Sequence, residues 1–127
     1  MIKFRAWNKE NEIYLYNVQD AYDTLSGFVK YDDGENASYD ECCFGEFLNN
    51  KRYDVEQFTG LKDVNGKDIY EGDIVENERG EILRVSYSAI GASFVAGNCY
   101  FGSIGAGKEI RIIGNVHENP ELLEEEK

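Results

Sequence analysis

The chain has 127 residues, enough for one compact domain or two very small ones, and its 25 acidic and 13 basic residues give a formal net charge of −12. Binding to a phosphate backbone or an anionic membrane needs clustered Lys and Arg, so we expect no direct contact with nucleic acid or membrane. The first residues lack the apolar core of a signal peptide, and three cysteines fit no secreted disulfide framework. We therefore expect a soluble protein of a reducing compartment.

The N-terminal half is predicted to form a small β sheet. Residues 2–7 alternate between apolar and polar faces, residues 8–11 form a polar turn, and residues 13–16 return as the second strand of a hairpin. Residues 27–31 predict a third strand, which ends at the turn 32–34. Over the whole chain, nine Tyr and seven Phe also favour β structure over helix.

Residues 40–50 are ambiguous between helix and loop. Phe44, Phe47 and Leu48 have the i, i+3, i+4 spacing of a helix face, but Gly45 interrupts a short run.

The C-terminal half is predicted to be a second β subdomain. Asn65 and Gly66 tolerate positive φ, so we expect a two-residue type I′ turn between extended segments. Frequent turns between short strands predict an SH3-like barrel or sandwich. The predicted fold class is thus mainly β with little helix, in two subdomains at residues 1–56 and 57–127. The expected strands after the turn cover residues 68–76, 81–87, 93–96 and 109–116, with a frayed helical turn after Pro120.

Residues 102–108 satisfy the P-loop spacing G-x-x-x-x-G-K. Glu109, however, stands where a P-loop has the Ser or Thr that ligates magnesium, and residues 109–113 have a strand pattern where a helix should begin. We interpret the segment as a Gly-rich β connection.

Residues 63–73 resemble a calcium loop in their density of oxygen atoms. An EF-hand has Gly at its sixth position and helices on both sides, whereas this segment has Gly fourth and strands on both sides. We interpret it as a hairpin with an acidic rim.

Cysteine and histidine offer little for chemistry. His117 is the only histidine, and the adjacent Cys42 and Cys43 lack the spacing of a zinc half-site. A Cys42 or Cys99 nucleophile would need His117 as its base, and sequence does not show whether they meet. We predict no catalytic, cofactor-binding or metal-ligating residue, and ordinary structural roles for these side chains.

Acidic residues concentrate between residues 31 and 56, where eight of them face two basic residues. Such a stripe could imitate the phosphates of DNA in the basic groove of a host protein, although acidic surfaces also simply keep proteins soluble. The proposed stripe comprises Asp32, Asp33, Glu35, Asp40, Glu41 and Glu46.

Three sequence blocks resemble the YopX family of phage and prophage proteins. They are FRAW near the start, QFTGLKDVNGKDIYEGDIV from Gln57 to Val75, and IGNVHENPEL from Ile113 to Leu122. The resemblance implies a small, mostly β protein of phage or prophage origin with two β subdomains, located in the bacterial cytoplasm. It implies no established activity and supplies no catalytic residues.

The leading hypothesis is a non-catalytic accessory protein that acts through protein contacts, possible also as a homo-oligomer. Trp7, Tyr14 and Tyr16 are the predicted contact residues because aromatic side chains are enriched at interface cores, although they could equally fill the core between the two halves. The alternative is a DNA-mimic inhibitor of a host DNA-binding protein. A metal-dependent hydrolase is a weaker alternative, and it would require clustered carboxylates.

Overall fold

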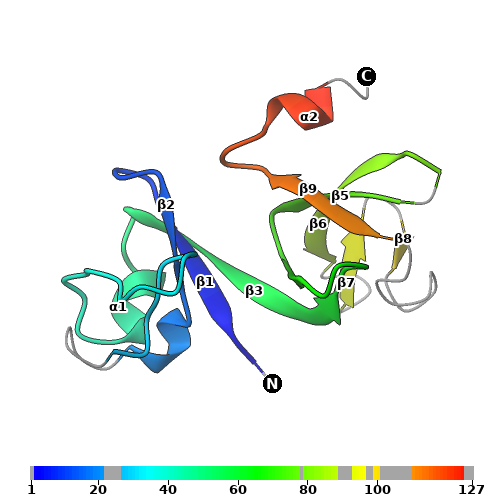
Figure 1. Cartoon of the computed structure of the whole chain (residues 1–127). Coiled ribbons are helices and arrows are strands. Elements are labelled where there is room, and N and C mark those ends of the chain that lie inside the picture. The colour runs from blue at the N-terminus through cyan, green and yellow to red at the C-terminus, as the bar shows by residue number, and fades with distance from the viewer. Residues whose placement is uncertain are drawn as a thin grey trace. The chain divides into compact units, whose positions relative to one another are not determined.

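The structure is a computed structural model that describes residues 2–21, 27–77, 79–88, 93–96, 99–100 and 110–124. The chain divides into two compact units, residues 1–57 and 58–127 (Figure 1). The regular secondary structure of both is mainly antiparallel strand, with only short helical segments, which confirms the predicted fold class.

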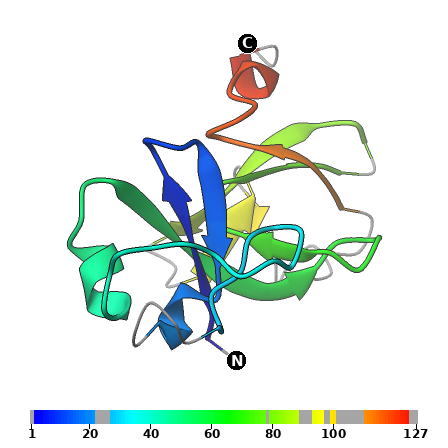
Figure 2. The same cartoon turned by 60° about the vertical axis from the view of Figure 1, so that its left-hand side comes forward.

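The first unit is built on a central strand with a partner on each side. β1 (Phe4–Asn8) pairs with β2 (Ile13–Tyr16) and with the first half of β3 (Tyr53–Lys62), antiparallel in both cases. The 3-10 helix η1 (Val18–Asp20) and the helix α1 (Phe44–Leu48) pack against this sheet through the buried Val18 and Phe47 (Figure 2). Phe4 and Ala6 of β1 pack in the core, as the expected alternation requires, but Arg5 and Trp7 between and after them are buried as well. The core cluster comprises Ala6, Leu15, Val18, Ala21, Val29, Ala37, Tyr39, Phe47 and Tyr53.

The predicted third strand at residues 27–31 was wrong. Only Lys30 pairs there, with Tyr16 on one side and Asn36 on the other. The chain turns back directly afterwards, where the Gly34 N–H donates to the Tyr31 carbonyl at 3.0 Å. Pairing across this turn is limited to the Lys30–Asn36 bridge and the backbone hydrogen bonds beside it. The segment covers the core through the buried Val29.

The ambiguous segment 40–50 contains the five-residue helix α1. Its Phe47 is fully buried, while Leu48 is 55% exposed. None of the helices in the described ranges is long and apolar enough to cross a membrane.

The second unit contains the other strands. β4 (Asp68–Tyr70) pairs with the second half of β3, and a five-stranded sheet has the order β8-β7-β6-β5-β9. These strands are β5 (Asp73–Glu76), β6 (Ile82–Ser88), β7 (Ser93–Ala96), β8 (Cys99–Tyr100) and β9 (Arg111–Asn115), followed by the short helix α2 (Glu121–Glu124). The core cluster comprises Ile69, Val75, Val85, Ala96 and Ile110.

The β3–β4 hairpin forms where expected, but its turn differs from the prediction. The Asp63 N–H donates to the Lys67 carbonyl at 2.8 Å, so Val64, Asn65 and Gly66 form a three-residue loop. Only Gly66 has positive φ, at 82°, whereas a type I′ turn needs two such residues. The Asp63 carboxylate selects this turn by accepting hydrogen bonds from the Asn65 and Lys67 N–H groups, both at 2.9 Å.

The predicted continuous strand 68–76 was also wrong, because a turn divides it into β4 and β5. Gly72 supplies a φ of 86° at the bend. The Asp73 carboxylate accepts a 2.8 Å hydrogen bond from the Tyr70 N–H and so stabilises the turn.

Candidate functional site

A shallow, open depression borders α1 in the first unit. Its lining residues are all of polar or charged types, and they include three carboxylates of the predicted acidic stripe, those of Asp40, Glu41 and Glu46. The other three stripe residues lie on or beside the turn that follows Tyr31. The remaining lining residues are Asn49, Asn50 and Lys51.

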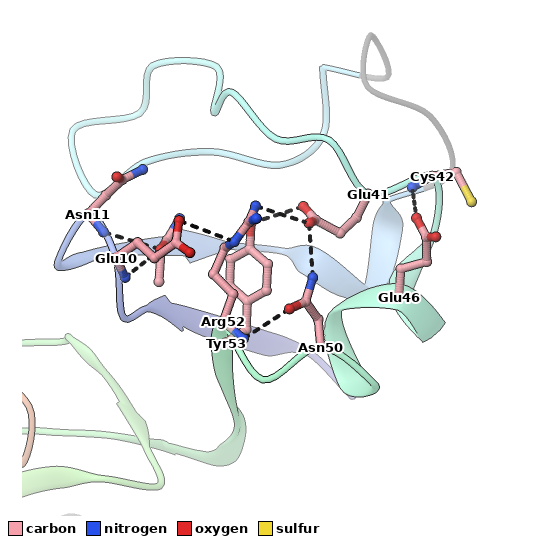
Figure 3. Close-up of polar contacts among 9 residues, drawn as sticks. Glu10, Asn11, Glu41, Cys42, Glu46, Asn50, Arg52 and Tyr53 are labelled. Atoms are coloured by element: carbon pink, nitrogen blue, oxygen red, sulfur yellow. Dashed lines mark hydrogen bonds and ion pairs between the residues drawn. The ribbon is translucent and has the colours of Figure 1, made fainter.

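Glu41 is the buried member of this group. Its Oε1 accepts a 2.9 Å hydrogen bond from the Tyr53 hydroxyl, and its Oε2 lies 3.4 Å from Asn50 Nδ2 and 3.8 Å from Arg52 Nη1 (Figure 3). Burial and the contact with Glu41 raise the pKa of Tyr53 above its usual value, so the phenol remains a donor at any physiological pH. Glu41 therefore belongs to the internal framework, and five of the six stripe residues are exposed.

Arg52 connects that framework to the β1–β2 hairpin. Its Nε lies 3.4 Å from Glu10 Oε2, and this negative charge is the largest of the influences that raise the pKa of Arg52. The backbone N–H of Arg52 also donates to Asn50 Oδ1 at 2.9 Å. One guanidinium thus bridges two carboxylates from separate loops, as Figure 3 shows.

Glu46 holds the start of α1. Its Oε1 accepts a 2.5 Å hydrogen bond from the Cys42 N–H, across the N-cap residue Cys43. Hydrogen bonds to Glu46 and then to Cys43 raise the pKa of Cys42 to about 11. Cys42 is therefore a protonated thiol at neutral pH, which is unfavourable for the nucleophile considered from the sequence.

A second buried polar group lies on the sheet face opposite the core cluster. Arg5 Nε donates to Glu56 Oε1 at 2.8 Å, and the Tyr14 hydroxyl donates to the same oxygen at 2.9 Å. The Arg5 guanidinium also lies 4.1 Å from the centre of the Tyr14 ring, a cation–π distance. The Arg5 guanidinium thus balances the charge of the buried Glu56 carboxylate, and the Tyr14 hydroxyl adds a hydrogen bond to it.

The predicted contact residues all lie at this polar group. Trp7 and Tyr14 pack edge to face with ring centres 4.9 Å apart, and both are buried. Tyr16 lies next to Tyr14 and is half-buried, the most accessible of the three. Their contact with another protein stays a prediction.

Asp63 is a buried polar residue of the second unit. Besides the two turn hydrogen bonds, its Oδ2 accepts a 3.0 Å bond from the Ile112 N–H of β9, and the Val64 N–H donates to the Ile110 carbonyl. Burial opposes ionisation of Asp63, but the backbone donors outweigh it and lower the pKa of this carboxyl. The hairpin is thereby fastened to β9.

The other acidic residues of the calcium-like segment also have internal partners. Asp68 pairs with Lys62 at 2.7 Å, and Asp73 accepts from the Tyr70 N–H. Across the described ranges, no group of three or more His, Cys, Asp and Glu side chains could hold a metal ion.

Two sequence features remain, the P-loop-like segment and His117. The P-loop-like segment 102–108 lies outside the described residues. His117 belongs to the second unit, where its N–H donates to Asn115 Oδ1, whereas Cys42 and Cys43 belong to the first.

Fold and polar framework together define a mostly β protein of two small units. The family model described as YopX protein matches residues 3–124, and the chain belongs to this family. It is also similar to the crystal structure of protein EF1440 from Enterococcus faecalis, with 29% identity and a TM-score of 0.63 over 97% of this chain and 98% of that chain. No curated protein matches the chain.

Proposed function

We propose that the protein is a non-catalytic phage or prophage accessory protein that acts in the bacterial cytoplasm by binding another protein through its acidic loops. Membership of the YopX family supports the origin. The observation that carries the proposal is the solvent exposure of the carboxylates between residues 31 and 40. Asp32, Asp33, Glu35 and Asp40 are all exposed.

These four carboxylates differ from four other acidic residues of the first unit. Glu10, Glu41, Asp54 and Glu56 each have a basic partner. Within the described residues, no ion pair involves Asp32, Asp33, Glu35 or Asp40. Their field is therefore available to steer a basic partner, and the resulting association would weaken with salt.

Exposed apolar side chains in the same unit support a protein partner over a small ion. Phe28 is 54% exposed and Leu48 is 55% exposed. Protein interfaces combine apolar contacts with a polar rim, and both kinds of side chain are present here.

The test is affinity capture from a bacterial host lysate with washes of rising salt, using two variants of equal charge. Asp32→Asn/Glu35→Gln removes two charges from the acidic loop, and the control Glu118→Gln/Glu121→Gln removes two from the C-terminal region. We expect a partner that wild type and control retain and that the loop variant releases at lower salt. Equal retention by all three would contradict the acidic loop as the binding surface.

The same carboxylates favour a second candidate, a DNA-mimic inhibitor. In that case the captured partner is a DNA-binding protein, and added duplex DNA competes with this chain for it. Recovery of the chain's own subunits alone would instead support a homo-oligomer, which light scattering would detect as a multiple of 14.5 kDa.

A further inference from the structure

The loop of the β3–β4 hairpin carries the only Asn-Gly pair of the sequence, and both Asn65 and Gly66 are exposed. The backbone N–H of Asn65 donates to Asp63 Oδ1, but in the part of the chain that the structure describes its side-chain amide makes no hydrogen bond. Apart from its chain neighbours, no described residue has an atom within 4 Å of the place where a Cβ of Gly66 would stand. The Asn65 amide can therefore turn toward the backbone without displacing a neighbour.

Covalent geometry keeps the two reacting groups of this pair within reach of each other. The Gly66 nitrogen is bonded to the Asn65 carbonyl carbon, so its attack on Asn65 Cγ closes a five-membered ring. Glycine has no Cβ to crowd this ring, and its backbone is the least restricted of all residues. Ring closure thus needs only rotation about bonds of the exposed loop.

Other asparagines lack this combination. In the described ranges, the other exposed ones are Asn11, Asn36 and Asn49, and none of them precedes a glycine. Asn36 Oδ1 and Asn49 Nδ2 are also engaged in hydrogen bonds. Asn65 is therefore the exposed asparagine whose surroundings favour cyclisation.

We propose that Asn65 is a site of spontaneous deamidation whose rate is set by the hydrogen bonds of Asp63. The bond from the Gly66 nitrogen to Asn65 Cγ forms, the bond from Cγ to the side-chain nitrogen breaks, and the Gly66 proton leaves with that nitrogen as ammonia. Water then opens the cyclic imide at either carbonyl, which gives aspartate or isoaspartate at position 65. No oxidant or reductant takes part, and either product adds one negative charge.

Asp63 restrains this reaction. Its carbonyl accepts a hydrogen bond from the Gly66 N–H at 2.9 Å, and its Oδ1 accepts from the Asn65 and Lys67 N–H groups, both at 2.9 Å. The Gly66 nitrogen must leave its hydrogen bond and lose its proton before it attacks Cγ. The closed loop therefore slows the reaction, and a looser loop should accelerate it.

The isoaspartyl product would weaken the attachment of the hairpin to β9. Isoaspartate lengthens the main chain by one methylene inside a loop that hydrogen bonds between Asp63 and Lys67 close. The same loop supplies the Val64 N–H, which donates to the Ile110 carbonyl at 2.9 Å. We expect the Val64 amide to exchange its hydrogen faster in the isoaspartyl form.

The test is incubation of the folded full chain at neutral and at mildly alkaline pH, followed by peptide mapping with mass spectrometry. We expect position 65 to convert before Asn11, Asn36 or Asn49 does, and to convert faster at the higher pH because the attacking nitrogen must lose its proton. Anion exchange should resolve the product from the starting chain, whose formal net charge is −12. A folded chain that keeps the Asn65 amide while the urea-unfolded chain loses it would overturn the proposal.

Two variants test the site and its restraint separately, with circular dichroism to verify that each is folded. Asn65→Gln should suppress the product, because a glutamine side chain must close a larger and less favourable ring. Asp63→Ala should accelerate deamidation on the order of 10-fold, because it removes two hydrogen bonds that hold the loop. Lys62→Met removes an ion pair of the same hairpin and should react as wild type does. Conversion of Asn65→Gln at the wild-type rate, or equal rates in Asp63→Ala and Lys62→Met, would each contradict the proposal.

Discussion

The two units neutralise their buried carboxylates in different ways. In the first unit, Glu56 contacts a guanidinium and a tyrosine hydroxyl, those of Arg5 and Tyr14. Glu41 has the same pair of partner types. In the second unit, Asp63 and Asp73 instead accept hydrogen bonds from backbone N–H groups.

This difference determines what each unit loses when a carboxylate is removed. In the first unit, removal of Glu56 takes away the carboxylate that the buried Arg5 guanidinium contacts, which is costly in a low-dielectric interior. In the second unit a turn or strand end loses acceptors for neutral donors, which costs less. The first unit should therefore be the more sensitive to single substitutions at these residues.

The largest expected effect is that of Glu56→Gln, which removes the negative charge that the buried Arg5 guanidinium contacts. We expect a loss of about 3–5 kcal/mol in the unfolding free energy of the first unit. Urea unfolding followed by the fluorescence of Trp7, the only tryptophan, measures this unit selectively.

A matched triple variant tests the reason for that loss. Arg5→Met/Tyr14→Phe/Glu56→Leu removes every polar member of the group, so it should be less destabilised than Glu56→Gln alone. A triple variant that is much less stable than the single one would show that the ion pair is net stabilising.

A smaller effect is expected for Asp63→Asn in the second unit. One amide oxygen cannot replace two carboxylate oxygens that together accept three backbone hydrogen bonds. We expect a loss of about 2 kcal/mol, equivalent to roughly 30-fold faster hydrogen exchange at the Ile112 amide. Asp68→Asn in the same hairpin is the control, and it should leave this amide protected.

Acid should distinguish Asp63 through its lowered pKa. The pKa in the folded state lies below the ordinary aspartate value of about 3.9, so the stabilisation is fully present above that value. It is lost as the pH falls from there through the folded-state pKa. Stability measured against pH should therefore fall more steeply in wild type than in Asp63→Asn, and parallel curves would contradict the role of this carboxylate.

The smallest effect is expected at an exposed ion pair of the second unit. Lys62 is 61% exposed where it meets Asp68. Lys62→Met should therefore cost less than about 1 kcal/mol, and added salt should reduce the difference in melting temperature further. A larger loss that salt leaves unchanged would mean that this pair is as important as the buried ones.

The strands could be predicted from sequence because their signal is local. β1, β2, β6 and β7 each have the composition or alternation of a strand within a few residues. The turn errors arose where an aspartate side chain reorganises the backbone, as Asp63 and Asp73 do. An Asp two residues before Asn-Gly is the signal that could have identified the three-residue loop.

The polar framework could not be predicted because it depends on register between distant segments. Arg5 lies directly opposite Glu56 across β1 and β3, 51 residues apart in sequence. Glu41 was included in a surface stripe, and its burial follows from meeting Arg52 and Tyr53. The exposure of the other stripe residues could be predicted from the sequence, because a turn rich in Asp and Gly normally lies on the surface.

The division of β3 between the units sets an order of assembly during translation. The first unit has all three of its strands once residue 57 has emerged, because β1 pairs with residues 53–57. The second unit must wait for Ile112, 49 residues after Asp63, before β9 can join β5 and the hairpin. At roughly 5–20 residues per second, the ribosome gives the first unit several seconds to fold before its neighbour can close.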